Sequence, residues 1–184
     1  DISSSSQTRE GAVKYTDWSI GDFLKRAKTK PWFDNTIFVI VADHCAKVAG
    51  KTEIPILDYH IPCWIYSPKW IAPQLEKRMV GQIDLAPTIL GLLNLQYKSK
   101  FYGYDVFQLE RGRERLFMGT YQNIGYVKGD KMVVLSPQKK VEMFKVNFNT
   151  GAEEKIPVDT SLLNEAIAYY QTASYLYKHN MYKK

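Results

Sequence analysis

A short apolar run that ends in an Asp-His pair constrains the fold of this chain most. Residues 37–42 read Ile-Phe-Val-Ile-Val-Ala, and Asp43 and His44 follow directly. Such a run of β-branched and aromatic residues is typical of a strand buried on both faces of an α/β sheet, with helices above and below. Ligands bind at the carboxyl ends of these strands. We therefore expect Asp43 and His44 to lie at a binding edge, where they can supply one oxygen and one nitrogen ligand to Zn²⁺ or Mn²⁺.

The composition fits a globular chain and argues against several classes of protein. The chain has 184 residues, 45% of them hydrophobic, so a sizeable core can form. The net charge is +6, but the lysines are dispersed and no arginine-rich helix stands out, so we expect no nucleic-acid partner. No apolar run approaches the roughly 18 residues of a membrane span. Cys45 and Cys63 fit no metal-binding spacing and are too few for a disulfide framework, so we expect two buried thiols.

The first part of the chain predicts a helix, a strand and a long loop. Residues 1–10 are polar and Ser-rich, which indicates a frayed start. Apolar residues then recur at helical spacing over 11–28, which predicts an amphipathic helix that packs on the sheet. Residues 43–60 show no clear helical pattern, and a connection of this length favours an active-site loop over a plain connector.

The direction of a second strand, over 61–67, decides whether His60 can join the Asp-His pair. If this strand runs antiparallel to the first, its start lies at the same edge of the sheet as Asp43 and His44. If it runs parallel, His60 lies at the far edge and cannot take part. The sequence alone leaves both arrangements open.

The second half predicts a short helix, a set of short strands and a long terminal helix. Asp84 is expected to be the N-cap of a helix that ends near Leu93. Gly129-Asp130 is a two-residue hairpin signal. Asp159 and Thr160 begin a helix that runs to about His179, and its aromatic residues suggest docking on the strands. The strands are expected over 115–119, 124–128, 131–135 and 141–148.

Three motifs in this order resemble a known family. Residues 36–45 read TIFVIVADHC, residues 60–68 read HIPCWIYSP, and residues 82–94 read QIDLAPTILGLLN. This series is similar to the C-terminal half of the sulfatase-type branch of the alkaline phosphatase superfamily. Asp-His in place of Asp-Asn is more similar to the membrane-anchored phosphoglycerol transferases, such as lipoteichoic acid synthases, and to the phosphoethanolamine transferases, than to arylsulfatases.

The resemblance implies an α/β fold built from part of an alkaline-phosphatase-like sheet with flanking helices. Residues 11–110 are then the C-terminal part of the catalytic domain, and residues 1–10 are a frayed start. Residues 111–184 form a small antiparallel β region and a C-terminal helix that packs on it.

The resemblance also implies roles for four residues. Asp43 and His44 become ligands of one divalent metal ion, usually Mn²⁺ or Zn²⁺, with Mg²⁺ and Ca²⁺ as alternatives. Lys51 is similar in place to a lysine with which sulfatases hold the anionic group of the substrate. His60 stands just before a strand where many relatives have Arg or His, and so becomes a substrate contact. A solvated lysine and a structural histidine are the alternative interpretations of these last two residues.

The chain shows only half of such a site. Nothing before Asn35 resembles the early metal-binding carboxylate of the family, and no Thr or Ser lies in the setting of its nucleophile. We therefore expect the chain to be the C-terminal piece of a longer enzyme, inactive alone. The enzyme is expected outside the cytoplasm or in the periplasm, attached to the membrane by N-terminal segments absent here. Its implied substrate is an anionic ester, either lipid-linked or free.

Two alternatives remain open at this stage. The first is a sulfuric ester hydrolase similar to arylsulfatases. The second is a non-catalytic interaction module in which the Asp43-His44 pair is vestigial. Without the N-terminal strands of the longer enzyme, the sheet is expected to expose an edge through which the isolated piece can dimerise.

Overall fold

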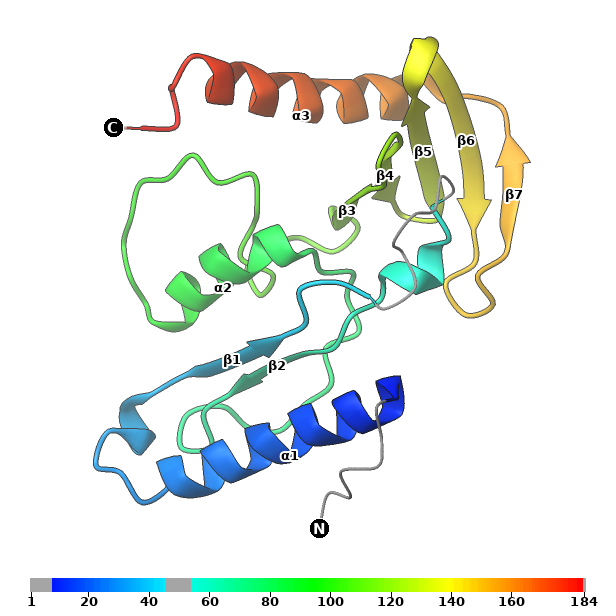
Figure 1. Ribbon diagram of the computed structural model, residues 1–184. Helices are drawn as coiled ribbons and strands as arrows, with labels where there is room; N and C mark the ends of the chain where they lie inside the picture. The colour runs from blue at the N-terminus through cyan, green and yellow to red at the C-terminus, as the bar shows by residue number, and fades with distance from the viewer. Residues whose placement is uncertain (1–7, 46–53, 184) are drawn as a thin grey trace. The chain divides into compact units, whose positions relative to one another are not determined.

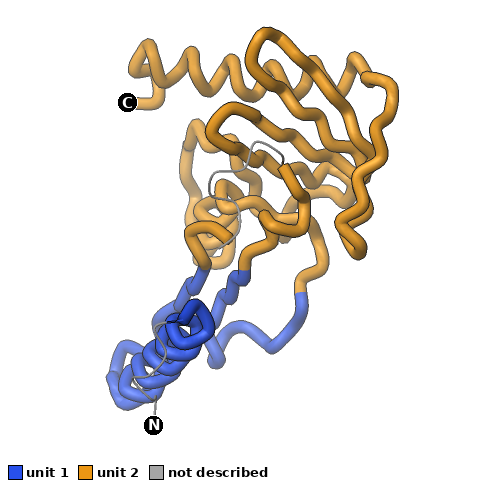
Figure 2. Tube along the Cα trace, turned by 45° about the vertical axis from the view of Figure 1, so that its right-hand side comes forward, with its two compact units in different colours: residues 1–41, 62–75 blue, residues 42–61, 76–184 orange. Residues whose placement is uncertain are grey.

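The computed structural model describes residues 8–45 and 54–183, and it divides into two compact units, blue and orange in Figure 2. The first takes its described residues from 8–41 and 62–75. The second takes them from 42–45, 54–61 and 76–183. The chain leaves the first unit after residue 41, returns to it at residue 62 and leaves again after residue 75. The domain boundary near residue 110 stays a prediction.

The first unit is a helix packed along a pair of strands (Figure 1). Helix α1 (Arg9–Ala27) begins two residues earlier than expected, because the Thr8 hydroxyl caps it by accepting the Gly11 N–H at 3.2 Å. A 3₁₀ turn, η1 (Phe33–Asn35), leads into strand β1 (Phe38–Val41). Strand β2 (Cys63–Tyr66) pairs with β1 in antiparallel register. The antiparallel alternative is therefore the correct one.

Aromatic residues around Phe38 form the core of this unit. Phe38 is buried, and its ring centroid lies 5.4 Å from that of Phe33 and 6.2 Å from that of Tyr66. The prediction that the whole strand is buried on both faces is wrong for this chain, since Val41 is exposed. The physical reason is the small sheet: within the described residues β1 and β2 pair only with each other, and α1 supplies the packing.

The second unit is built on a five-stranded antiparallel sheet whose strands follow one another in chain order. Four of the strands match the predicted ones closely. The last, β7, was not predicted, because Glu-Glu-Lys-Ile lacks alternating apolar residues. The strands are β3 (Arg115–Gly119), β4 (Ile124–Lys128), β5 (Lys131–Ser136), β6 (Lys140–Val146) and β7 (Glu153–Ile156), with a 3₁₀ turn, η4 (Pro137–Lys139), before β6.

Both faces of this sheet are covered by apolar packing. Successive side chains of a strand point to opposite faces, so each strand contributes to both. Tyr126, Val133 and Met143 pack against Leu162 and Ala166 of helix α3 (Thr160–Lys178). The prediction of a C-terminal helix that docks on antiparallel strands is confirmed. The α/β fold class with a small antiparallel region is confirmed as well.

The opposite face is covered by residues expected to form a loop. Ile54 and Ile56 are buried against Val127 and Met132. Ile56 is the first residue of the 3₁₀ turn η2 (Ile56–Tyr59). The Tyr59 hydroxyl donates to the carbonyl of Gly119 at 3.0 Å. The described end of the 43–60 segment is therefore anchored as part of the core of the second unit.

Candidate metal site

Asp43 and His44 lie directly beyond the end of β1, at a bend in the chain. Residues i and i+1 of a strand point to opposite faces, so two adjacent side chains can converge only where the strand has ended. Here the bend lets them do so. The side chain of Asp43 is 88% exposed and that of His44 is 70% exposed, so both are open to a ligand.

The local hydrogen bonds set the orientation of both side chains. The backbone N–H of His44 donates to Asp43 Oδ1 at 2.9 Å. His44 Nδ1 lies 3.0 Å from the carbonyl oxygen of Cys45. Because a carbonyl can only accept, Nδ1 carries the proton in the neutral ring, and Nε2 presents a lone pair. Nε2 in turn lies 3.5 Å from Asp43 Oδ2.

This geometry fits a divalent cation held by the pair. Two lone-pair atoms that face each other at 3.5 Å repel unless a proton or a metal ion lies between them. Two bonds of about 2.0–2.2 Å at a roughly tetrahedral angle put a nitrogen and an oxygen ligand ~3.4 Å apart, close to this separation. The carbonyl at Nδ1 is also the usual partner of a metal-binding histidine. Asp43 and His44 therefore suit a metal ion as one oxygen and one nitrogen ligand.

The described residues complete only part of such a site. Within 8–45 and 54–183, no group of three or more His, Cys, Asp or Glu side chains is arranged to hold a metal ion. Two protein ligands leave a Zn²⁺ or Mn²⁺ ion short of its usual coordination. That Asp43 and His44 form half of a metal centre therefore stays a prediction.

His60 comes close to the pair through its main chain. Cys45 Sγ donates to the carbonyl oxygen of His60 at 3.3 Å, and the His60 side chain is exposed. The antiparallel pairing of β1 and β2 places Cys63 opposite Val41, as that alternative required. Lys51, the other predicted substrate contact, lies outside the described residues.

The two cysteines are not the buried thiols that we expected. Cys45 is half-buried and Cys63 is exposed, because β2 has an open face in the first unit. Burial and then the negative charge of Asp58 raise the pKa of the Cys45 thiol. Burial raises the pKa of Cys63. Raised pKa values keep both groups as thiols and disfavour metal binding through sulfur.

Gln82 is a residue beside this site that sequence reasoning missed. Its side-chain Nε2 donates to the carbonyl oxygens of Ala42 at 2.9 Å and of Asp43 at 3.0 Å. Gln82 opens the 3₁₀ turn η3 (Gln82–Asp84), which leads into helix α2 (Leu85–Leu92). It lies in the third motif of the resemblance, but a side-chain contact to a main chain some 40 residues away leaves no pattern in the sequence.

Asp84 was predicted as a helix cap, and this is only half correct. It occupies the N-cap position of α2, but its side chain makes no capping bond to that helix. Its carboxylate instead accepts the N–H groups of Gly81 and Tyr104, both at 2.9 Å, and pairs with Arg115 Nη1 at 2.9 Å. The physical reason is burial. The Asp84 side chain is only 3% exposed, and a buried carboxylate is costly unless it pairs with a cation.

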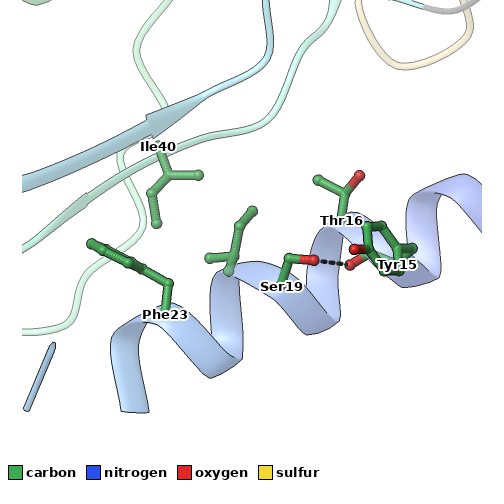
Figure 3. Close-up of a pocket in the computed structure, with 6 residues that line it drawn as sticks. Tyr15, Thr16, Ser19, Phe23 and Ile40 are labelled. Atoms are coloured by element: carbon green, nitrogen blue, oxygen red, sulfur yellow. Dashed lines mark hydrogen bonds between the residues drawn. The ribbon is translucent and has the colours of Figure 1, made fainter. Parts of the chain in front are cut away.

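A shallow apolar hollow lies elsewhere, in the first unit. Figure 3 shows its lining side chains, which come from one face of α1 and from Ile40 of β1. The Ser19 hydroxyl donates to the main-chain oxygen of Tyr15 at 2.7 Å. None of the six lining residues is a metal-binding or nucleophilic group with an activating partner, so this hollow offers no catalytic chemistry. Its lining is Tyr15, Thr16, Ser19, Ile20, Phe23 and Ile40.

Comparisons with known proteins agree with the three motifs. A family model described as Sulfatase matches residues 3–95. The whole chain superposes on a solved protein of the alkaline phosphatase superfamily from Vibrio parahaemolyticus, with a TM-score of 0.92 and 36% sequence identity, and covers 45% of that protein. Lipoteichoic acid synthase 2 of Bacillus subtilis is 31% identical over 114 residues, which are 54% of this chain and 17% of the synthase. A lipoteichoic acid synthase-like protein of the same organism is 28% identical over 116 residues, 54% of this chain and 19% of that protein. The chain thus spans less than half the length of each of these relatives.

Proposed function

The chain belongs to the sulfatase family, and on this premise we propose that it forms part of a longer metal-dependent enzyme that acts on phosphodiester or sulfate esters. The observation that carries the proposal is the Asp43–His44 pair, whose exposed side chains bring Nε2 and Oδ2 to 3.5 Å from each other. A phosphodiester is the favoured substrate class, because two relatives are named as lipoteichoic acid synthases or similar to them. The reaction proposed is therefore of the phosphoglycerol transferase type.

Each residue of the pair has a distinct role in this proposal. The Asp43 carboxylate contributes the negative charge that retains a cation, and neutral His44 contributes a nitrogen ligand whose tautomer Cys45 fixes through its carbonyl. A bound divalent ion would neutralise charge on the transferring group and lower the pKa of an attacking oxygen. His60, and Lys51 from outside the described residues, would contact the anionic group of the ester. The nucleophile and the remaining ligands come from outside this chain.

The proposed partners follow from the same relatives. We place the substrate among anionic esters that are lipid-linked, and the enzyme on the extracytoplasmic side of a membrane. Among the described helices of this chain, none combines the length and the apolar character needed to cross a bilayer. The proposal includes attachment of the longer enzyme to the membrane through N-terminal segments.

Two alternative hypotheses compete with this proposed function. The family model bears the name Sulfatase, which favours a sulfuric ester hydrolase as the alternative enzyme. A non-catalytic interaction module is supported by exposed aromatic residues on α3, such as Tyr175 and Tyr177. The sequence encoded upstream of residue 1 separates the enzymes from the module. An acidic strand-end residue and a Thr or Ser nucleophile there would support an enzyme, and an unrelated domain would contradict it.

A turnover assay tests the proposal. We expect this chain alone to hydrolyse neither bis(4-nitrophenyl) phosphate nor 4-nitrophenyl sulfate, and the longer gene product to cleave the phosphodiester with added Mn²⁺. Asp43→Ala in the longer protein is expected to reduce turnover by at least about 100-fold, since it removes a direct ligand. Preference for the sulfate ester would favour the arylsulfatase-like alternative. Turnover that is independent of Asp43 would contradict the proposed site.

A further inference from the structure

We propose that Gln82 is a positioning residue for the Asp43–His44 pair. Its side-chain amide holds the main chain at Ala42 and Asp43, and so aims the two ligand side chains at one point. The inference rests on the proposed metal-binding role of this pair. It assigns a function to a residue whose side chain bonds the main chain that carries the two ligands.

The two hydrogen bonds of Gln82 leave no ambiguity in the orientation of its amide. Nε2 lies 2.9 Å from the oxygen of Ala42 and 3.0 Å from the oxygen of Asp43. Both partners are carbonyl oxygens, which only accept, so the NH₂ group and not the amide oxygen must face them. Both hydrogens of one NH₂ group are thus used on two consecutive peptide units.

The clamped segment has little other support from regular structure. Val41 is the last residue of β1 in register with β2, so Ala42 and Asp43 lie beyond the strand pairing. The local bonds at His44 N and Nδ1 fix the side chains relative to their own backbone. The bonds from Gln82 fix that backbone relative to η3. Orientation of the pair in space therefore depends on Gln82.

Gln82 can act as a clamp because its own turn is held by a buried carboxylate. Asp84, two residues further on, bonds the N–H of Gly81 and so closes the turn around Gln82. Its other oxygen accepts the N–H of Tyr104 and the guanidinium of Arg115. The side chains of Asp84 and Arg115 are 3% and 2% exposed. A buried, multiply bonded carboxylate thus anchors the turn, and Gln82 transmits that anchor to the exposed metal pair.

The experiment replaces Gln82 by a side chain of similar volume without a donor. Gln82→Met in the 184-residue chain is compared with Gln122→Met, a matched change at an exposed glutamine of the same unit. Mn²⁺ affinity is measured from the paramagnetic broadening of backbone amide signals near residues 42–45. The order parameters of the same amides are measured without metal, and global stability is measured by urea unfolding.

We expect Q82M to weaken Mn²⁺ binding by about 10-fold and to increase the mobility of residues 42–45 without metal, with Q122M unchanged. Global stability should be similar in the two variants. Wild-type affinity and mobility in Q82M would overturn the positioning role. An equal loss in Q122M, or a loss in Q82M that follows a fall in global stability, would overturn it as well.

A double variant, Asp43→Ala with His44→Ala, separates this inference from the proposed function. If the double variant binds Mn²⁺ as well as the wild type, the metal pair itself is refuted. If the double variant loses binding while Q82M retains it fully, the pair stands and only the role of Gln82 falls.

Discussion

Arg115 and Asp84 form a fully buried ion pair in the second unit. Besides Asp84, the guanidinium donates to the carbonyl oxygen of Tyr102 at 2.5 Å and stacks on the ring of Tyr104, 4.1 Å from its centroid. Its Nε is buried without a hydrogen-bond partner among the described atoms. The pair joins the start of β3 to the turn before α2, so its loss should affect the stability of the second unit as a whole.

Removing one partner of this pair should therefore be costly. Arg115→Met leaves the Asp84 carboxylate buried without its cation, and we expect the free energy of unfolding to fall by about 3–5 kcal/mol. Lys145→Met, which removes an exposed pair with Asp130 in the same unit, should cost at most about 0.5 kcal/mol. Urea unfolding measures both. An equal loss of unfolding free energy in the two variants would contradict a larger contribution of the buried pair to stability.

The sequence indicated little of this arrangement at the scale of single residues. Asp84 was recognised as polar at a helix start, which predicts a cap. Its partner is 31 residues away and opens a strand, where a buried arginine is not expected. Asp43 and His44 were identifiable because they interrupt an apolar run. Gln82 and Arg115 were not, because long-range side-chain contacts have no local signature.

At the scale of elements, the packing of α3 on the sheet buries three tyrosines in part: Tyr126 of β4, and Tyr169 and Tyr170 of α3 itself. Burial, followed by the hydrogen bond to Glu165, raises the pKa of Tyr126 well above its ordinary value. Burial raises the pKa of Tyr170 as well, and its hydroxyl donates to the carbonyl oxygen of Gly125 at 2.9 Å. Burial and the hydrogen bond to Tyr104 raise the pKa of Tyr169 to about 12. The packing of α3 on the sheet therefore favours neutral tyrosines.

This predicts a loss of stability in alkali. An unfolded tyrosine loses its proton near pH 10, whereas these groups keep theirs in the folded state. The unfolded chain then binds fewer protons, so stability is complete below pH 10 and falls as the pH rises towards 12 and beyond. Urea unfolding between pH 8 and pH 11.5 measures how the free energy of unfolding changes with pH. The slope of this dependence gives the number of protons released on unfolding.

Tyr170→Phe should make this slope shallower, because it removes one of the three titrating groups. Tyr121→Phe is the matched control, since Tyr121 is 98% exposed and should leave the slope unchanged. A slope that is the same in the wild type and in Y170F would contradict the role assigned to Tyr170.

Elements with strong periodicity were predictable, and elements defined by tertiary packing were not. Strands β3 to β6 alternate apolar residues on both faces, and the predicted limits lie within two residues of the observed ones. Strand β7 is polar and was missed, because its pairing with β6 and not its own pattern defines it. Likewise Ile54 and Ile56 were assigned to a loop, although they fill one face of the sheet. Their role depends on a partner more than 60 residues along the chain.

At the scale of the whole molecule, the first unit leaves apolar surface and strand edges without a partner in the described residues. Val13 and Trp18 of α1, and Val41 and Trp64 of the two strands, are all exposed. A two-stranded sheet has two open edges, and exposed edges favour pairing with another chain. We propose that the 184-residue chain self-associates through this unit.

Light scattering at increasing protein concentration tests self-association. We expect the weight-average mass to rise above that of the 21.3 kDa monomer as the concentration increases. Trp64→Lys, on the exposed part of β2, should shift this rise to higher concentration. A strict monomer at all concentrations would contradict the proposal.

The sequence showed the family-like motifs and predicted half of a metal site, but it did not show the contacts that position the Asp43–His44 pair. The pair itself was predictable because the strand and its polar ending are adjacent in sequence. The bend that brings Nε2 to face Oδ2, and the clamp from Gln82, depend on contacts between distant segments. The division into two units likewise depends on distant segments, because the first unit combines residues up to 41 with residues 62–75.

The most direct test of the account is a Mn²⁺ titration of the 184-residue chain. We expect a single weak site, with a dissociation constant above about 1 µM because only two ligands are present. His44→Ala should abolish binding, and His179→Ala, at the exposed end of α3, should leave it unchanged. A tight stoichiometric site, or binding that survives in H44A, would contradict the assignment of Asp43 and His44 as half of a metal centre.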